Sequence, residues 1–539
     1  MTFAQTSGYG ADLIASGRTA LGIELGSTRI KACLVDAADP SVILAVGAYA
    51  WENSYVDGLW TYALEEVRDG LRAAYATLVA EVGERYGVVP STYAAIGVSA
   101  MMHGYIALGE AGELLVPFRT WRNTNTGLAA AELSEVLGVN IPLRWSVAHL
   151  RQAVLDDEAH LADVAHVTTL AGYVHDQLTG RRVLGVGDAS GMFPIRGAGV
   201  LADYDERLVA RFDALAPDRI PPLRALLPEV LPAGADAGEL TDAGATFLDP
   251  TGTLRPGIPL CPPEGDAGTG MVATNAVAPR SGNVSAGTSI FAMVVLEKPL
   301  AHVHHELDLV TTPAGDPVAM VHCNNGASEL AAWAGLFERF SVAAGARLDS
   351  DAVFDVLFRE ALEGEPDAAG LVAYNHLAGE PIVGLTGGRP LFVRTPDSTL
   401  NLANVMRAQL YGVFSTLALG MEVLHSEGVA LDRMYAHGGM FRTTGVAQRF
   451  LAAALAAPVA VGDTASEGGA WGMAVLAAFR LAAAGDGSAS LSAYLTDVVF
   501  ADAAASIAAP EPADVAGFAT YLDRYRAGLA VEAAAVAAL

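Results

Sequence analysis

One short segment constrains the fold of this chain more than any other. Residues 21–36 read Leu-Gly-Ile-Glu-Leu-Gly-Ser-Thr-Arg-Ile-Lys-Ala-Cys-Leu-Val-Asp, and apolar residues alternate with others on both sides of a central Gly-Ser-Thr. Alternation with a period of two residues predicts two short strands, each with one face toward a core. The segment is therefore expected to form a β-hairpin.

The turn of this hairpin carries groups that suit an anion. Gly26 lets a ligand approach the backbone closely, Ser27 and Thr28 add N–H groups and hydroxyls, and Glu24 and Lys31 flank them. Lys31 is one of only two lysines in the chain, which indicates a need for a compact positive charge; an ordinary exposed lysine is the alternative. A nucleotide phosphate with its metal ion is the ligand that we expect here.

Length and composition limit the class of protein. A chain of 539 residues with 52% hydrophobic residues is long and apolar enough for two large domains. Its formal charge of −28 argues against binding nucleic acid or an anionic membrane. Three cysteines at unrelated spacings predict neither a zinc site nor a disulfide framework, and they favour a reducing compartment. The sequence shows no basic leader and no uncharged apolar run of ~20 residues, so a cytoplasmic protein without a membrane span is expected.

The rest of the chain alternates between predicted helices and strands. The apolar spacing predicts a buried strand at 94–99 and helices at 64–86, 129–137, 170–178 and 402–426. A Pro-rich stretch, 217–263, is expected to be mostly loop and leads to Gly265-Asp266. Residues 281–296 then repeat the pattern of a strand, a Gly-Thr-Ser turn and a second strand, which marks a second domain.

In this order, the motifs resemble those of the FGGY family of carbohydrate kinases, over roughly residues 20 to 480. That family begins with Asp-x-Gly-Thr-Thr-x-x-Lys/Arg, a Gln-Met-His-Gly loop and a Trp-Asn-Asp segment. The matching segments here are Glu24–Lys31, Met101–Gly104 and Trp121–Asn123. The later family motifs are matched by Gly187–Gly191, Glu264–Asp266, Ser285–Ser289, His437–Met440 and Glu467–Ala470.

The resemblance implies a fold and a domain organisation. It implies an α/β protein with two actin-like, ribonuclease H-like domains, each a mixed sheet of the five-stranded type flanked by helices, with an inter-domain cleft for ATP. We expect an N-terminal kinase domain at 20–280, a C-terminal kinase domain at 281–485 and a helical C-terminal extension at 486–539.

The resemblance also assigns roles to residues of this sequence. It makes Asp266 the general base and, with Glu24, a metal-binding residue for Mg²⁺; an N-cap of the following helix is the alternative for Asp266. Glu24 is one methylene longer than the family aspartate. The residues that it implies for phosphate and ATP binding are Gly26, Ser27, Thr28, Lys31, Gly287, Thr288, Ser289, Gly438, Gly439, Met440 and Thr443.

On the sugar side, the matching motifs supply candidate substrate ligands. These are Met102, His103, Trp121, Arg122, Asn123 and Asp266. His103 and Trp121 have plain core positions as their alternatives. The family Trp-Asn-Asp is Trp-Arg-Asn here, which exchanges a carboxylate for an amide and places a cation beside it. The Met-His-Gly loop favours a ketopentose such as xylulose, whereas Arg122 would also suit an acidic polyol.

The implied function is ATP-dependent phosphorylation of a hydroxyl of a small sugar or polyol, in the cytoplasm, and the family analogy allows a homodimer. The main alternative is a non-transferring ATPase or nucleotide-gated switch with the same fold, because a fold does not fix a function. A dinucleotide oxidoreductase is disfavoured, because the Gly-x-Gly-x-x-Gly turn with its later acid is missing from the sequence.

Overall fold

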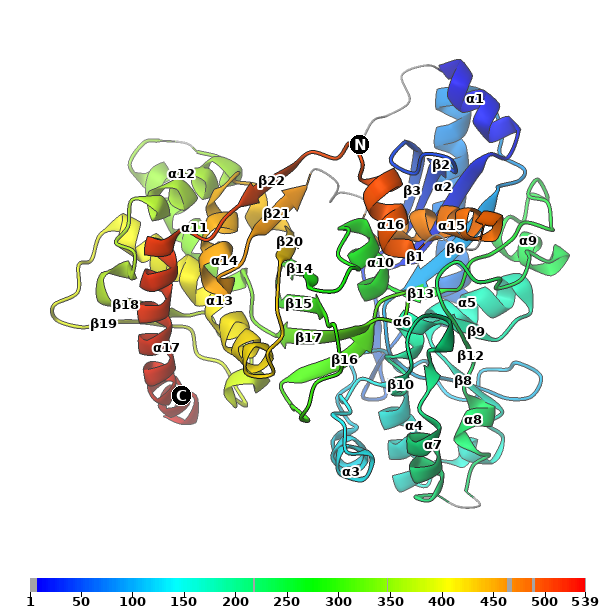
Figure 1. Cartoon of the computed structure of the whole chain (residues 1–539), viewed down its shortest axis with the longest axis horizontal. Coiled ribbons are helices and arrows are strands. Elements are labelled where there is room, and N and C mark those ends of the chain that lie inside the picture. Colours follow the sequence, from blue (N-terminus) through cyan, green and yellow to red (C-terminus); the bar gives the residue numbers. More distant parts are fainter. Residues whose placement is uncertain (1–6, 217–218, 347, 463–467, 487–489, 539) are drawn as a thin grey trace. The chain divides into compact units, whose positions relative to one another are not determined.

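The computed structural model describes residues 7–216, 219–346, 348–462, 468–486 and 490–538. The chain forms two compact units, each with its own sheet (Figure 1). Unit 1 comprises Met1–Ala278, Leu309–Val318 and Ser466–Ala503, and unit 2 comprises Pro279–Asp308, Ala319–Ala465 and Ala504–Leu539.

A five-stranded mixed sheet forms the centre of unit 1. In spatial order its strands are β13 (Glu264–Gly265), β6 (Ala95–Ala100), β1 (Thr19–Leu25), β2 (Arg29–Asp36) and β3 (Ile43–Ala50). The three strands β1, β2 and β3 are antiparallel neighbours, whereas β6 runs parallel to both β1 and β13. This is the five-stranded arrangement that the family resemblance implies, and β1 and β2 form the predicted hairpin.

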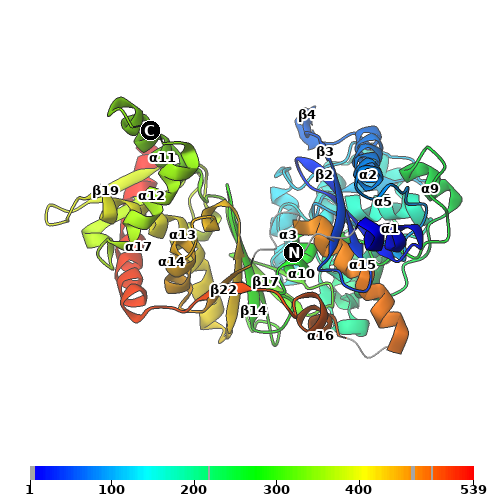
Figure 2. The same cartoon turned by 90° about the horizontal axis from the view of Figure 1, so that it is seen from above.

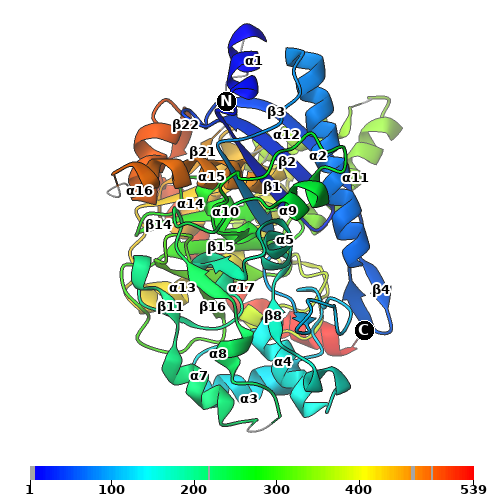
Figure 3. The ribbon, with the colours of Figure 1, turned by 90° about the vertical axis from the view of Figure 1, so that its right-hand side faces the viewer.

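Helices cover both faces of this sheet, and the strand register shows which face each helix takes. Gly22 pairs with Cys33, and Gly47 pairs with the preceding residue of β2, Ala32, so the two glycines point to opposite faces. A Cβ on Gly22 would strike the backbone of α15 (Gly468–Asp486), and one on Gly47 would strike α2 (Leu64–Tyr86). Figure 3 shows these two helices on either side of the strands.

Smaller elements complete unit 1. The remaining helices are α1 (Ser7–Ala15), α3 (Gly127–Leu137), α4 (Ser146–Leu155), α5 (Leu170–Thr179), α6 (Val186–Ala189), α7 (Glu206–Asp213), α8 (Leu223–Leu226), α9 (Asp242–Leu248), α10 (Asp266–Ala273) and α16 (Leu491–Tyr494). Two-stranded pairs are β4 (Ser54–Val56) with β5 (Leu59–Thr61), β7 (Ile106–Leu108) with β8 (His166–Thr168), β9 (Val183–Gly185) with β12 (Glu229–Leu231), and β10 (Ile195–Arg196) with β11 (Asp203–Tyr204).

Unit 2 is built on a seven-stranded sheet, wider than the expected five-stranded one. Its spatial order is β16 (Leu307–Thr311), β17 (Pro317–Cys323), β15 (Ile290–Val295), β14 (Ser281–Ala286), β20 (Arg433–His437), β21 (Val459–Gly462) and β22 (Ala505–Ala508). The edge strand β22 pairs antiparallel with β21 and comes from the C-terminal region, which was expected to be helical throughout. A separate pair joins β18 (Leu371–Tyr374) to β19 (Leu391–Arg394).

The helices of unit 2 gather on one side of its sheet (Figure 2). They are α11 (Ser328–Ala343), α12 (Ser350–Leu362), α13 (Leu402–Ser426), α14 (Val446–Leu455) and α17 (Pro512–Ala538). The central helix, α13, has the bounds that its apolar spacing predicts. Tyr521 and Tyr525 of α17 are fully buried in the core of unit 2.

The units and the expected domain ranges divide the chain differently near the C-terminus. Helix α15 falls in the expected second domain, yet it packs on β1 in unit 1, where the Trp471 indole donates to Pro40 O. Residues 486–539 do not form one separate extension, because α16 belongs to unit 1 whereas β22 and α17 belong to unit 2.

Within the described ranges, one helical stretch, Gly468–Gly485 of α15, is long and apolar enough to cross a membrane, and 61% of it is buried in the protein. Its packing on β1 accounts for that apolar character. All three cysteines are buried and outside any disulfide.

Candidate active site

The carboxyl ends of three parallel strands lie side by side at one edge of the sheet in unit 1. The chain leaves β13 at Asp266, β6 at Met101 and β1 at Gly26. Ligands of open α/β sheets bind at this edge. Three of the sequence motifs, far apart in the chain, are thus brought together.

The turn between β1 and β2 directs its N–H groups outward. The carbonyl of Gly26 accepts from the indole of Trp51 (2.7 Å), that of Ser27 from the hydroxyl of Tyr62 (2.7 Å), and that of Thr28 from Trp51 N (3.1 Å). A trans peptide points its N–H opposite to its carbonyl, so the Ser27 and Thr28 N–H groups face away from these anchors. Both residues are exposed, which leaves this side of the turn open to an anion.

The turn between β14 and β15 in unit 2 repeats this construction. Gly287 N donates to Ser289 O (2.9 Å), which closes the turn. The carbonyls of Gly287 and Thr288 accept from Ala327 N (2.8 Å) and Gly326 N (2.7 Å), just before α11. The N–H groups of Thr288 and Ser289 therefore point to the opposite side. Each unit thus carries one turn of the kind that binds phosphate.

Lys31 and Glu24 face each other across the first hairpin, and both are half-buried. The carboxylate of Glu24 lies against the first turn of α15, because a Cβ on Gly469 would overlap Glu24 Oε1. The positive end of a helix dipole stabilises a carboxylate there. The preceding part of this motif, Glu467, lies outside the described residues.

Hydroxyl groups connect Glu24 with the start of α10. Ser99 pairs with Glu24 in the strand register, and its hydroxyl lies 3.2 Å from Thr269 Oγ1. The Thr269 hydroxyl also lies 3.2 Å from Asp266 O. Glu24 and Thr269 both lie against Gly469, and Thr269 contacts Ser99 and the main-chain carbonyl of Asp266, so polar groups of three elements gather at the strand ends.

Asp266 is the first residue of α10 and is exposed. Its Oδ1 accepts a hydrogen bond from Met102 N at 3.1 Å, so the Met-His-Gly loop fixes the direction of the carboxyl group. Desolvation by the surrounding protein raises the pKa of Asp266, although backbone N–H groups oppose the rise. A general base works best when its pKa lies near the working pH, and the raised pKa brings the Asp266 carboxylate closer to that condition.

Two further acids lie close to Asp266, and neither was expected as a site residue. Asp188 and Glu264 are 0% and 1% exposed. Burial raises the pKa of Asp188 to about 7, and the charge of Asp266 adds to the rise, against a 2.6 Å hydrogen bond from Thr169. Burial raises the pKa of Glu264 to about 8, and Asp188 adds to it. Acids beside the Gly-Asp motif were visible in the sequence, but their burial was not.

His103 takes an unusual backbone conformation in the same loop. Its φ of 68° lies in the left-handed region, and its side chain is buried. The imidazole Nδ1 lies 3.1 Å from Gly191 O, so Nδ1 carries the proton and donates. His103 is thus a buried histidine with its ring held by the Gly187–Gly191 loop, and its role in sugar binding stays a prediction.

The Trp-Arg-Asn segment divides into three environments. Trp121 is 39% exposed, so the core position considered for it is wrong. Arg122 is exposed, with its guanidinium 3.8 Å from the ring centre of Trp60 and bonded to Asn53 Oδ1 at 3.1 Å. Asn123 is buried: its amide accepts from Trp60 N and donates to Trp60 O, both at 2.8 Å. Asn123 therefore holds the β4–β5 hairpin, which differs from the expected role as a substrate ligand.

The Gly438-Gly439 turn lies beside the turn at 287–289 in unit 2, because Ser285 and His437 pair in adjacent parallel strands. The turns at 26–28 and 287–289 are called the phosphate-type turns. A Cβ on Gly438 would overlap Ala286 O, and its φ is 118°, so only glycine fits there. Gly439 is exposed and open.

The other two expected adenosine neighbours are buried. Met440 is 4% exposed and lies in the core of unit 2, and Thr443 is 9% exposed. Both side chains are therefore packed inside unit 2, which differs from the contact with ATP expected for them. The reason is that the short helix after Gly438 turns Met440 inward.

The donor groups at the unit 1 edge suit a hard divalent cation. Glu24 and Asp266 offer carboxylate oxygens, whereas the Ser99 and Thr269 hydroxyls are buried and hydrogen-bonded within the protein. Oxygen ligands with room for water are what Mg²⁺ prefers. The residues therefore fit the metal ion that ATP chemistry implies.

The two sheets and their paired phosphate-type turns define an actin-like ATPase architecture. Comparison with family models gives the same class: residues 19–272 match the N-terminal domain, and residues 282–481 the C-terminal domain, of the FGGY family of carbohydrate kinases. The chain therefore belongs to this family and is a phosphotransferase of the carbohydrate kinase type.

Solved structures of the same fold belong to kinases that are named for different substrates. Xylulose kinase from Rhodospirillum rubrum is 21% identical, with a TM-score of 0.76 over 95% of this chain and 99% of that one. Gluconate kinase from Lactobacillus acidophilus is 17% identical, with a TM-score of 0.76 over 95% and 98%. Plasmodium falciparum glycerol kinase with ADP is 14% identical, with a TM-score of 0.72 over 95% and 97%. Comparison with curated proteins gives no match.

Proposed function

We propose that this chain transfers the terminal phosphate of ATP to a hydroxyl of a small sugar or polyol, with a ketopentose such as xylulose as the first candidate. The observation that carries the proposal is the hydrogen bond from Met102 N to Asp266 Oδ1. It joins the expected base to the Met-His-Gly loop, which the family resemblance places on the sugar side. A base must lie within hydrogen-bond reach of the proton that it removes.

In the proposed mechanism, the substrate hydroxyl donates to the Asp266 carboxylate. As the hydroxyl oxygen bonds to the terminal phosphorus, its proton passes to Asp266 and the bond from phosphorus to the ADP oxygen breaks. The raised pKa of Asp266 makes it a better proton acceptor once it is ionised.

The two turns are the proposed phosphate-binding elements. Their outward N–H groups, with the hydroxyls of Ser27, Thr28, Thr288 and Ser289 and the ammonium of Lys31, offer donors to the triphosphate. Glu24 and Asp266 would hold Mg²⁺, which neutralises phosphate charge when bound. Gly438 and Gly439 leave space for the adenosine.

On the sugar side, we assign hydroxyl binding to His103 and stacking to Trp121, since one ring is held by hydrogen bonding and the other is exposed. Asn123 is left out, because its amide is occupied by Trp60.

Arg122 favours a second substrate class, the sugar acids. Its guanidinium is fixed by Trp60 and Asn53 and remains exposed, so it could pair with a carboxylate. A ketopentose offers no such charge. The class of acceptor that the protein phosphorylates therefore distinguishes a ketopentose kinase from a sugar-acid kinase.

A substrate screen tests the proposal. Purified protein with ATP and Mg²⁺ is assayed for ADP release with ketopentoses, polyols and sugar acids. Release that depends on one class of acceptor supports the kinase, and Arg122→Gln should lower kcat/KM only if that acceptor is an acid. ADP release that is equal with and without every acceptor would contradict transfer and favour the ATPase or nucleotide-gated switch.

We also propose that the protein acts in the cytoplasm, where ATP is supplied, and that it forms a homodimer as an analogy with related kinases. Light scattering during size-exclusion chromatography measures the mass directly. A mass near twice 55.6 kDa would support the dimer, and a mass of one chain would contradict it.

A further inference from the structure

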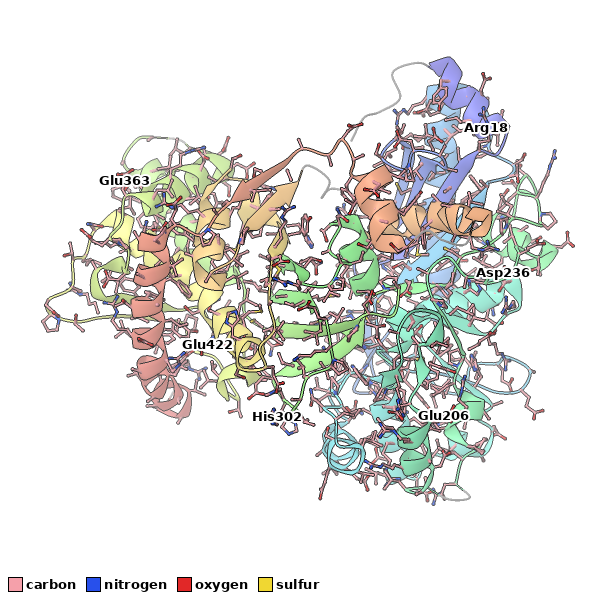
Figure 4. All side chains as sticks on the ribbon, in the orientation of Figure 1. Arg18, Glu206, Asp236, His302, Glu363 and Glu422 are labelled. Carbon is pink, nitrogen blue, oxygen red and sulfur yellow. The ribbon has the colours of Figure 1, made fainter. Side chains whose placement is uncertain are left out.

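Three of the twelve histidines lie within one four-residue stretch, 302–305, and two of them meet an acid from elsewhere in unit 2. The stretch belongs to the loop between β15 and β16, and Figure 4 labels His302 on it. The acid is Glu427, the residue that ends α13. No motif of the kinase site includes these residues.

The three side chains converge on one point. His302 Nδ1 lies 2.8 Å, and His304 Nε2 lies 2.7 Å, from the same oxygen, Glu427 Oε1. All three candidate ligand atoms lie within 4.8 Å of one another. Hydrogen bonds alone would explain why two imidazoles surround one carboxylate. A metal ion, however, also requires several ligand atoms that lie close together in this way.

The carboxylate is oriented independently of the imidazoles. Glu427 Oε2 accepts from Ala301 N at 2.7 Å, and Oε1 from His302 N at 3.2 Å. Backbone hydrogen bonds of this kind fix a ligand before the metal arrives. The side chain of Glu427 is 5% exposed, whereas that of His302 is 79% exposed. The cluster therefore has a rigid inner member and an outer side open to solvent.

We infer that His302, His304 and Glu427 form a binding site for a transition-metal ion of the Zn²⁺ class, separate from the ATP metal. Two imidazole nitrogens and one carboxylate oxygen are a ligand set that Zn²⁺ favours, whereas Mg²⁺ and Ca²⁺ prefer oxygen alone. Ligands of a tetrahedral zinc ion lie about 3.3 Å apart, so each imidazole has to move only ~0.5 Å from Glu427 Oε1. A water molecule would complete the coordination from the exposed side.

The bound ion would join the β15–β16 loop to the end of α13 within unit 2. Residues 302 and 427 are separated by 125 positions in sequence, so the ion would close a long loop. A cross-link of this type stabilises the folded state. Metal binding should therefore raise the temperature at which unit 2 unfolds.

Zinc titration of the full-length protein tests the site. After chelator treatment and dialysis, Zn²⁺ is titrated in competition with a chromogenic chelator, and Co²⁺ replaces it for visible absorption spectra. We expect one ion per chain, a cobalt spectrum of a four-coordinate site and no displacement by millimolar Mg²⁺.

His302→Ala and His304→Ala should each weaken Zn²⁺ binding by about 100-fold or more and abolish the rise in unfolding temperature on adding Zn²⁺. His305→Ala is the matched control, because this exposed histidine lies in the same loop but outside the cluster, and its affinity should stay within ~3-fold of the unmodified protein. Zinc binding that is weak and multiple, as expected for an acidic surface, or that is equal in all three variants, would overturn the site.

Discussion

Glu24 is one methylene longer than the aspartate of the family motif, and the extra length carries its carboxylate to the first turn of α15 beside Thr269. Two roles are compatible with this position. The carboxylate can help to hold Mg²⁺, or it can stabilise the helix by interacting with its dipole.

Glu24→Asp and Glu24→Gln separate these roles. If Glu24 holds the metal, Glu24→Asp should keep or improve activity, while Glu24→Gln should raise the Mg²⁺ concentration for half-maximal rate by ~10-fold or more. Steady-state rates across a Mg²⁺ series measure this. An unchanged Mg²⁺ requirement with a lowered unfolding temperature in both variants would leave only the helix role.

The buried acid Asp188 gives the site a pH dependence. Burial, together with the charge of Asp266, raises the pKa of Asp188 to about 7, so Asp188 changes its charge near neutral pH beside the expected general base. Asp188→Asn removes this change of charge. A kcat/KM profile measured across neutral pH should therefore lose the ionisation near pH 7 that the unmodified protein shows.

Asp188→Asn should also change how the free energy of unfolding depends on pH. An acid whose pKa is raised on folding binds its proton more tightly in the folded state, so it lowers stability as pH rises from about 4 to 7. Asp188→Asn should therefore flatten the fall in unfolding free energy over this range, measured by urea denaturation at several pH values. Identical pH profiles for both proteins would contradict the assigned pKa.

Residue types and spacing were enough to predict the turns at 26–28 and 287–289, because alternation and glycine are local signals, while the roles of these turns and of Asp266 stay predictions. They were not enough for Asn123 and Met440. Whether an amide faces a ligand or a neighbouring backbone depends on the β4–β5 hairpin, which the motif does not encode.

At the scale of elements, the turn at 287–289 depends on the backbone of Gly326. A Cβ at this position would overlap Gly287 O and lie 2.9 Å from Thr288 O. Gly326→Ala should displace the turn and raise the KM for ATP by ~10-fold or more, with a smaller effect on the KM for the sugar.

Gly335→Ala is the matched control in α11, where an added Cβ meets no atom within 4 Å. Alanine favours a helix over glycine by roughly 1 kcal/mol, so this variant should be as stable as the original or more so, with normal kinetics. An unaltered KM for ATP in Gly326→Ala would show that this turn does not bind the nucleotide.

Local patterns predicted the hairpins and the bounds of α13, because alternation and helical spacing are properties of neighbouring residues. The position of α15 was not predictable in this way. Its packing partner, β1, is more than 400 residues earlier in the chain, and only the fold brings Gly22 against Ala474.

At the scale of the whole molecule, the C-terminal region is an integral part of unit 2. Strand β22 extends the sheet, the Tyr521 hydroxyl donates to Ala408 O (2.9 Å), and the fully buried Glu532 lies 2.8 Å from His376. The sequence predicted helix here but not this burial, because an Ala-rich helix carries little amphipathic signal.

Deletion of residues 504–539 should therefore unfold unit 2, because it exposes the core around Tyr374 and Tyr411. Scanning calorimetry should show the loss of a transition, together with the loss of nucleotide binding. Val531→Ser, at a position 52% exposed, serves as the control and should unfold normally. A truncated chain that unfolds at the original temperature would make this region a dispensable extension.

Asp266 is expected to remove the proton from the acceptor hydroxyl, and Asp266→Asn tests this role most directly. The amide keeps the size of the side chain but cannot accept that proton as a carboxylate does. Acceptor-dependent ADP release should fall by ~100-fold or more, while the affinity for ATP, measured by calorimetry, stays within a few-fold. Near-normal turnover in this variant would contradict the account.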